Sequence, residues 1–250
     1  RFLALVLWPL GSIDRSRQLA AQGVRTAGEK RALSQANALV HKAVFDGLCG
    51  GMLQETETIL ALALAREHTM PLYVAAGSYL TGLAKWRAGD RMNGLEEMRR
   101  GWTSLRENDC YLCEPFWGLQ VAVANAEAGQ VESGLEILQQ LIAWTERSGQ
   151  RWLDAELHRS RAEFLLRLES PHVSMAEDAL HKAMEVARTQ QTRTFELRSA
   201  VALAHLYNAT GRAGAIFGLL APILADFDRG QDLPEIRTAE SLLTHKSAVA

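Results

Sequence analysis

The sequence predicts an all-α protein, a right-handed α-solenoid of about six helical hairpins, each about 40 residues long. Three observations carry this prediction. Turn-forming residues recur at a nearly constant interval, and apolar residues between the turns follow the spacing of amphipathic helices. No segment alternates apolar and polar residues cleanly enough to predict a strand.

The turns set the period of the repeat. Glycine tolerates the left-handed backbone at the end of a helix, and proline is tolerated in the first turn of the next helix. The turn positions are Gly11, Gly51, Gly89, Gly129, Pro171 and Gly211. The intervals between successive positions are 40, 38, 40, 42 and 40 residues. Each is therefore predicted to join the two helices of one hairpin.

Small residues follow the turns at a fixed distance. Close packing of two helices requires a small side chain where they cross. Five residues after each turn position stand Ser16, Thr56, Gly94, Gly134, Ala176 and Ile216, of which only the last is large. This register supports the hairpin assignment.

The two helices of a hairpin have different apolar patterns. In the second helix of the fourth unit, Val131, Leu135, Leu138, Ile142 and Thr145 form one stripe. The first helix of the next unit, at 152–168, is apolar around more of its circumference, so the first helix is predicted to be the inner one. Helices are expected near 13–28, 31–48, 52–68, 71–88, 91–106, 113–128, 131–147, 151–168, 172–189, 192–209, 212–228 and 234–245.

These helices predict one solenoid over residues 1–250, cut from a larger protein. Residues 1–10 are interpreted as the end of a truncated repeat helix, and 234–245 as a capping helix. The predicted units are 1–28, 31–68, 71–106, 113–147, 151–189 and 192–228.

Composition limits the function classes. Lys and Arg number 27 against 29 Asp and Glu, and 48% of residues are hydrophobic, which is typical of a folded soluble protein and does not suggest a nucleic-acid binder. Three cysteines are too few and too odd in number for a disulfide framework, which favours a reducing compartment and hence the cytoplasm.

The repeat register resembles the tetratricopeptide family in a lengthened form. The segments ERSGQRWLDAELHRSRAEFLLRLES, AEDALHKAMEVARTQQTRTFELRSAVALAHLYNATGRAGAIFGLLAPIL and FDRGQDLPEIRTAESLL resemble the carboxy-terminal helical region of bacterial adenylate or guanylate cyclase–ATPase proteins and ATP-dependent transcriptional regulators. The resemblance is good over about residues 140–245. It implies a non-catalytic region that senses or scaffolds, with catalytic domains before Arg1. Ala162 stands where relatives usually have glycine, which implies slightly different helix packing.

Motifs that suggest chemistry are weak. Residues 23–30, GVRTAGEK, lack the Gly-Lys-Ser/Thr ending of a phosphate loop and lie between predicted helices. Cys110 and Cys113 form a C-x-x-C pair without a second ligand pair for zinc, so a structural role is favoured over a redox or metal role. No cofactor, metal or catalytic residue is predicted.

Candidate partner-binding residues fall into two groups. Tyr111 lies within the polar connection ENDCYLCEP, and Trp117 lies just after it. Trp152 is one of several tryptophans spread over consecutive units, although packing is the commoner role of such aromatics. Charges gather on one predicted inner helix, where they are suited to a groove for an anionic or peptide ligand: Glu156, Arg159, Arg161 and Glu163. Glu196-Leu197 follows Glu156-Leu157 by 40 residues, so an ion pair between repeats competes with the groove and is favoured.

The sequence thus predicts a protein-interaction or autoregulatory region whose groove accepts a protein or peptide segment, either from a partner or from another domain of its own chain. Nucleic acid and membranes are not expected as partners. The alternative is a sensor that binds a small-molecule inducer inside the superhelix. A cysteine-dependent enzyme has the least support.

Overall fold

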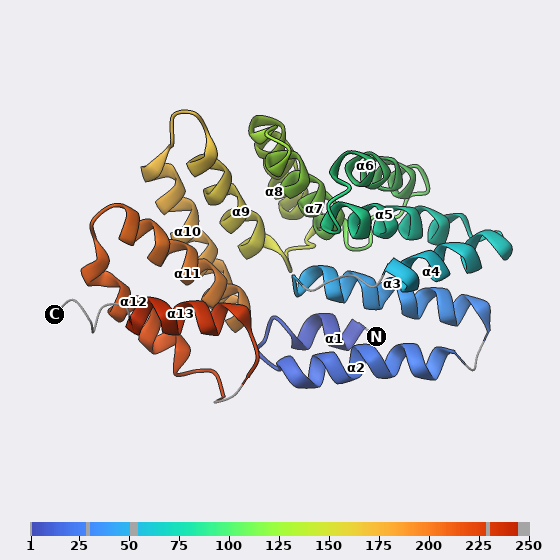
Figure 1. The fold of residues 1–250 in the computed structure, drawn as a ribbon, viewed down its shortest axis with the longest axis horizontal. Coiled ribbons are helices and arrows are strands. Elements are labelled where there is room, and N and C mark those ends of the chain that lie inside the picture. Colours follow the sequence, from blue (N-terminus) through green and yellow to red (C-terminus); the bar gives the residue numbers. More distant parts are fainter. Residues whose placement is uncertain (1, 29–30, 51–54, 229–230, 245–250) are drawn as a thin grey trace. The chain divides into compact units, whose positions relative to one another are not determined.

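The computed structural model describes residues 2–28, 31–50, 55–228 and 231–244. This part of the chain contains thirteen α-helices and one 3-10 turn, and no strand (Figure 1). In chain order the helices are α1 (Phe2–Leu7), α2 (Ile13–Ala27), α3 (Ala32–Leu48), α4 (Glu55–Glu67), α5 (Pro71–Arg87), α6 (Arg91–Glu107), α7 (Glu114–Glu127), α8 (Val131–Ser148), α9 (Asp154–Arg167), α10 (Val173–Thr189), α11 (Arg193–Ala209), α12 (Ile216–Leu224) and α13 (Pro234–Thr244). The predicted all-α class is confirmed.

The chain forms two compact units. Unit 1 comprises Arg1–Val6 and Arg15–Ile137, and unit 2 comprises Leu7–Asp14 and Leu138–Ala250. In unit 1, α3 packs on α4 and α5 packs on α6, while the first helices α3 and α5 also contact each other. In unit 2, α9 packs on α10 and α11 on α12, while α11 also contacts α9 and α13. Sequential packing of this kind is consistent with an α-solenoid.

Glycines end the first helix of most hairpins. The backbone φ is positive at Gly11 (92°), Gly89 (104°), Gly129 (84°) and Gly211 (74°), as the turn prediction requires. Gly51 lies outside the described residues, and Gly50 beside it has φ 71°. Pro171 differs from the prediction, because it lies in the connection before α10 and not inside its first turn.

The connections between hairpins use the same backbone geometry with different residues. Positive φ occurs at Thr69 (50°), Asp109 (51°), Gly149 (76°) and Gln191 (57°). Their spacings, 109 − 69 = 40, 149 − 109 = 40 and 191 − 149 = 42, repeat the period of the first set. Sequence reasoning missed this second series because only one of its four members is glycine.

Close helix crossing occurs where small residues were predicted. A Cβ added to Gly94 of α6 would lie 2.5 Å from the Trp86 backbone nitrogen and 2.7 Å from the Gly82 carbonyl oxygen. Ser16 and Ala176 are fully buried, and so is the larger Ile216, at 3% exposure. The side chain of Thr56 lies outside the described residues. The register of small residues therefore reflects real helix contacts.

Two predicted features are corrected. The expected helix over 212–228 is instead a 3-10 turn at Ala213–Ala215 followed by α12, which ends at Leu224. In α8 the buried stripe consists of Gly134, Leu138, Leu141 and Thr145, whereas Val131, Leu135 and Ile142 are half-buried. Helix α8 therefore turns its buried face slightly away from the predicted one.

The turn after α1 packs within unit 2. The Thr194 backbone nitrogen donates to the Pro9 carbonyl (3.0 Å), and the Thr194 hydroxyl donates to the Trp8 carbonyl (2.8 Å). Trp8 is fully buried, with its ring against Phe195 and under the Arg198 guanidinium at 4.6 Å. These contacts fix residues 8–11 on α11.

Candidate functional site

An apolar pocket of about 70 Å³ opens in unit 1. It lies across the first helices of three successive hairpins and the connection between α6 and α7. Its lining residues are Asn37, Val40, His41 and Val44 of α3, Leu72, Tyr73 and Ala76 of α5, Leu105 of α6, Cys110, Leu112 and Cys113 of the connection, and Trp117 of α7. We call it the α3–α5–α7 pocket.

Helical spacing places these residues on one face. Positions 37, 40, 41 and 44 of α3 and 72, 73 and 76 of α5 follow the three- and four-residue intervals of a helix surface. Leu33 stands one turn before Asn37 on the same face of α3. The pocket therefore arises because three successive first helices present the same kind of face to it.

Trp117 forms a rigid wall of the pocket. Its indole nitrogen donates to the Leu112 carbonyl (2.8 Å), and its own carbonyl accepts a hydrogen bond from the Tyr79 hydroxyl (2.6 Å). The Tyr79 and Trp117 rings meet edge-on at 4.9 Å. Trp117 is only 4% exposed, so it shapes the pocket from within.

The start of α7 is held by a buried carboxylate. Glu114 is 1% exposed and accepts hydrogen bonds from the Trp102 indole (3.1 Å) and from Arg106 Nε (2.8 Å). Cys113, at the preceding position, has a left-handed backbone with φ 59°. The connection that ends there contributes Cys110, Leu112 and Cys113 to the lining of the pocket.

Polar groups stand at the mouth of the pocket beside large exposed apolar side chains. The Asn37 amide donates to the Tyr73 hydroxyl (2.8 Å), and the His41 ring, whose Nδ1 lies 2.7 Å from the Asn37 carbonyl, packs edge-on against Phe2 at 4.4 Å. Two lining residues, Leu72 (37%) and Leu112 (52%), are exposed apolar side chains. Their neighbourhood adds Leu33 (53%), one helical turn before the lining Asn37, and Tyr111 (41%), next to Leu112 in the chain. A rim of this composition is typical of an interaction surface.

The two cysteines of the C-x-x-C pair both line the pocket. Burial, with a smaller contribution from Cys110, raises the pKa of Cys113 to about 12, so this thiol is neutral at physiological pH and a poor nucleophile. Among the described residues no group of three or more His, Cys, Asp or Glu side chains could hold a metal ion. Cys113 therefore forms part of the apolar wall of the pocket.

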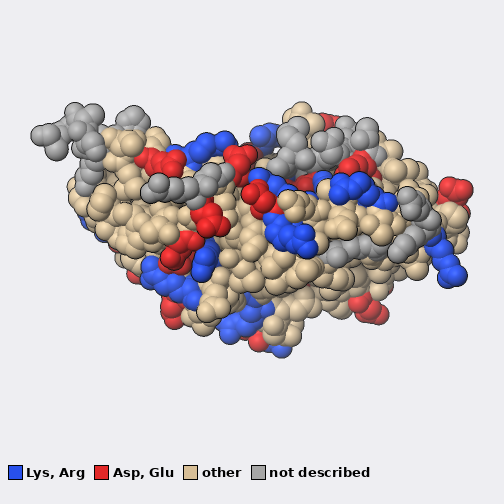
Figure 2. All heavy atoms as spheres, turned by 90° about the horizontal axis from the view of Figure 1, so that it is seen from below, with Lys and Arg blue, Asp and Glu red and all other residues tan. Residues whose placement is uncertain are grey.

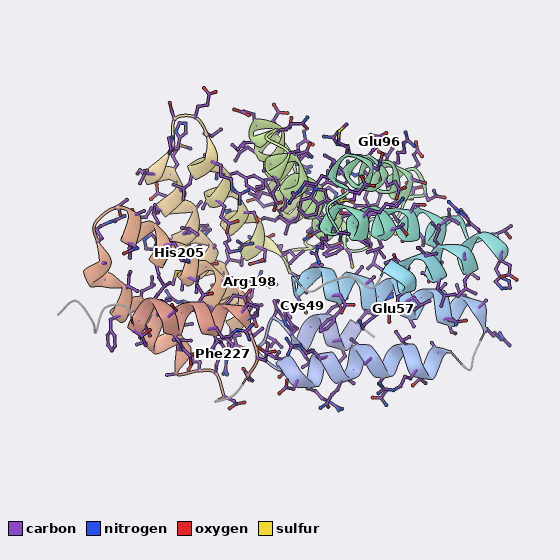
Figure 3. All side chains as sticks on the ribbon, viewed as in Figure 1. Cys49, Glu57, Glu96, Arg198, His205 and Phe227 are labelled. Atoms are coloured by element: carbon purple, nitrogen blue, oxygen red, sulfur yellow. The ribbon has the colours of Figure 1, made fainter. Side chains whose placement is uncertain are left out.

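A second cluster in unit 2 is a ladder of alternating charges. It runs Glu163, Arg159, Glu156, Arg198, Glu235, across α9, α11 and α13 (Figure 3 labels Arg198). Its N···O distances, in the same order, are 2.5, 3.0, 3.1 and 2.7 Å. The Glu156–Arg198 contact joins two hairpins, which confirms the predicted ion pair between repeats.

Glu156 is ionised at the centre of this ladder. The side chain is buried, and burial alone would raise its pKa, but the Arg159 and Arg198 guanidinium groups lower it below its ordinary value. The same pairing, with Glu156 and Glu163, raises the pKa of Arg159. Glu156, between two guanidinium groups, is therefore fully paired and is not available to a ligand.

The structure divides the predicted site residues. Trp117 lines the α3–α5–α7 pocket, whereas Tyr111 stands in the chain between the lining residues Cys110 and Leu112 and is not part of the lining. Glu156, Arg159 and Glu163 come together in the ladder. Trp152, half-buried in the turn before α9, and Arg161, half-buried on α9, belong to neither set. Sequence reasoning missed Leu33, Asn37, Leu72, Tyr73, Arg198 and Glu235, although the helical spacing of Leu33, Asn37, His41 and Val44 was visible.

A wider hollow of about 260 Å³ lies in unit 2, beside α12. Arg188, Glu196, Gly218, Leu219, Pro222, Ile223 and Asp226 line it. Arg188 and Glu196 form an ion pair at 2.6 Å within it. Its walls are therefore largely polar, in contrast to those of the pocket in unit 1.

Charges of both signs are mixed on the face that Figure 2 displays. No broad field of one sign appears there, although a basic stripe is the usual sign of a nucleic-acid-binding surface. None of the helices in the described part of the chain has the length and apolar character that crossing a bilayer requires.

The comparisons with known proteins add one relative. No family model matches the chain. An uncharacterized protein of Rhizobium meliloti (strain 1021) is similar to it, with 26% identity over 212 residues, which cover 84% of this chain. The chain spans about a fifth, 20%, of the length of that relative.

Proposed function

We propose that the chain is a non-catalytic protein-interaction region of a longer bacterial, cytoplasmic signalling protein, built from tetratricopeptide-like repeats of about 40 residues in a right-handed superhelix. Its partner is a protein or peptide segment, including segments of other domains of the same protein. The α3–α5–α7 pocket with its exposed apolar rim is the observation that carries this proposal.

Pocket size supports a polypeptide partner over a metabolite. Small-molecule sites commonly enclose about 300–1,000 Å³, whereas the pocket holds about 70 Å³. A space of this size accepts one side chain, while the surrounding rim supplies contact area for the rest of a peptide. Insertion of anchoring side chains of a peptide into an apolar groove of its partner is a common mode of peptide binding.

A small-molecule sensor is the second candidate. The hollow beside α12, at about 260 Å³, approaches the lower end of the usual ligand volume. The ion pair between the exposed Arg188 and the half-buried Glu196 would have to separate in order to bind a charged metabolite. This requirement makes the sensor the weaker candidate.

The test compares the whole 250-residue chain with a variant that fills the pocket. Ala76→Leu adds three carbons to a buried position of the pocket wall. Both proteins are immobilised and exposed to a lysate of the source organism, separated into protein and low-molecular-weight fractions. The Glu132→Lys, Glu136→Lys double variant, on the exposed face of α8, is the control for changes away from the pocket.

The proposal predicts a protein that the chain and the α8 control retain and that Ala76→Leu loses. A rise in thermal stability with the low-molecular-weight fraction alone would favour the sensor. Retention that is equal on all three proteins would contradict a role for the pocket.

A further inference from the structure

Two thiols share one small space in unit 1. Cys110 and Cys113 both line the α3–α5–α7 pocket, whose volume is only about 70 Å³. Both are free cysteines, and Cys110 is half-buried whereas Cys113 is buried. One thiol is therefore partly open to solvent and the other is shielded, and the proposed function uses neither of them.

The chain reverses its direction around these cysteines. The Cys110 backbone nitrogen donates to the Leu105 carbonyl (2.9 Å), and the Glu114 nitrogen donates to the Tyr111 carbonyl (3.2 Å), which closes a tight turn. Cys113 lies inside that turn with a left-handed backbone, φ 59°. A disulfide needs Cα atoms about 4.4–6.8 Å apart, a separation that residues three apart reach in tight turns and cannot reach in an extended chain. The backbone therefore favours a bond between the two sulfurs.

The two thiols also act on each other electrostatically. Burial raises the pKa of Cys113 to about 12, and Cys110 adds to the rise, as a close neighbour does. A thiol with so high a pKa does not stabilise the dithiol form as a thiolate. A disulfide made from it therefore resists reduction, although it forms and breaks slowly near neutral pH.

We infer that Cys110 and Cys113 are a redox-sensitive pair that a low-molecular-weight disulfide converts to an intramolecular disulfide in the wall of the pocket. The Cys110 thiolate attacks a sulfur of the reagent, so a mixed disulfide forms on Cys110 and one thiolate leaves. Cys113 then gives its proton to water, and its sulfur attacks the Cys110 sulfur and releases the second thiolate. Two protein thiols are oxidised, one reagent disulfide is reduced to two thiols, and the protons lost by the cysteines end on those thiols.

Closing this bond changes the wall of the pocket. Leu112 lies between the two cysteines in the chain and lines the pocket with them. Its carbonyl accepts the hydrogen bond of the Trp117 indole (2.8 Å), so a shift of Leu112 reaches that wall as well. Under the proposed function, the dithiol and disulfide forms should therefore retain a protein partner to different extents. This consequence rests on the proposed function, whereas the chemistry of the pair does not.

The experiment equilibrates the whole chain with mixtures of reduced and oxidised glutathione, followed by acid quenching, intact mass measurement and peptide mapping. We expect a monomeric chain that loses the mass of two hydrogen atoms and carries a bridge between Cys110 and Cys113. Cys49→Ser removes the remaining cysteine of the chain and should form the same bridge. On that background, Cys113→Ala should accumulate one glutathione on Cys110, while Cys110→Ala should leave the buried Cys113 unmodified.

The pH dependence of the second step identifies Cys113 as the attacking thiol. The rate at which the mixed disulfide closes should rise about tenfold for each pH unit between about pH 7 and 9, because the thiolate fraction of Cys113 grows in this way below its pKa. A closure rate that does not change with pH would contradict this order of attack.

Unfolding in urea distinguishes a pair arranged by the fold from two cysteines that are merely close in the sequence. A bond that fits the folded backbone leaves the oxidised chain at least as stable as the reduced chain, with an unchanged or higher urea midpoint. A lower midpoint would show that the fold holds the sulfurs apart, and would overturn the inference. Bridges that form only between chains, or only in urea, would overturn it too. None of these measurements contains a protein partner, so their failure would leave the proposed function standing.

Discussion

The role of Glu156 is left open by its sequence pattern and is decided by its surroundings in the structure. The pattern allowed both a ligand-binding carboxylate and an ion pair. The structure buries Glu156 to 3% exposure between Arg159 and Arg198, so its charge is already matched. Removing one member of a buried charge pair is costly because it leaves the other members without compensation.

Glu156→Gln should therefore reduce the free energy of unfolding by about 3 kcal/mol. The pairing lowers the pKa of Glu156, so the stability it contributes is fully present above its ordinary value of 4.5 and is lost as pH falls through the lowered pKa. Chemical denaturation of both proteins at several pH values measures this.

The control for this prediction is Glu163→Gln. Glu163 pairs with the same Arg159, but its side chain is 36% exposed, so the loss should stay below about 1 kcal/mol. Equal losses for the two variants, or a Glu156 effect that does not shrink in acid, would show that the ladder does not hold a buried charge.

Glycines at helix crossings give a second prediction at the residue scale. Gly94→Ala places a methyl group against the backbone of α5, at 2.5 Å from the Trp86 nitrogen. The free energy of unfolding of unit 1 should therefore fall by about 2 kcal/mol or more. The methyl group that Gly218→Ala adds in α12 meets nothing within 4 Å. The higher helix propensity of alanine should raise the free energy of unfolding by about 0.5–1 kcal/mol. Thermal unfolding distinguishes them, and a neutral Gly94→Ala would contradict the close crossing of α5 and α6.

At the scale of the element, most helices end in one motif. In the connection after α4, the Met70 backbone nitrogen donates to the Ala65 carbonyl (2.8 Å) and the Thr69 nitrogen to Arg66 (3.2 Å); after α5, Asp90 and Gly89 make the same two bonds to Lys85 and Trp86. This double hydrogen bond requires a left-handed residue. Glycine meets the requirement without strain, and a β-branched residue meets it at a cost.

Thr69→Gly should therefore stabilise unit 1 by about 1 kcal/mol, because it removes the strain of a β-branched residue at φ 50°. Gly89→Thr introduces the same strain at φ 104° and should destabilise by at least as much. Midpoints of urea unfolding provide the comparison. A loss of stability in Thr69→Gly would mean that the threonine side chain contributes more than its backbone costs.

The helices were predictable because their signals are local. Gly89, Gly129 and Gly211 mark turns whatever surrounds them, and most helix ends agree with the prediction within about three residues. The α12 region was mispredicted because apolar residues continue beyond the point where the helix ends. Thr69 and Gln191 show the limit, since their left-handed geometry leaves no compositional trace.

At the scale of the whole molecule, the site was less predictable than the helices. Tyr111 and Trp117 were singled out from an unusual connection, but the pocket that Trp117 lines also needs Asn37 and Tyr73, 36 residues apart. Contacts between hairpins depend on the register of one repeat against the next, which periodicity alone does not specify. The pairing of Arg198 with Glu156 was missed for the same reason, because it depends on how α11 packs on α9.

The central claim is that the first-helix face of unit 1 binds a polypeptide segment. Amide hydrogen exchange of the whole chain, with and without the retained protein partner, tests it most directly. We predict slower exchange on binding in residues 37–44 of α3, in the amino-terminal half of α5 and in residues 105–117, with little change in α4, in the rest of α6 and in α8. Protection concentrated on α4, α6 and α8, or confined to unit 2, would contradict the claim.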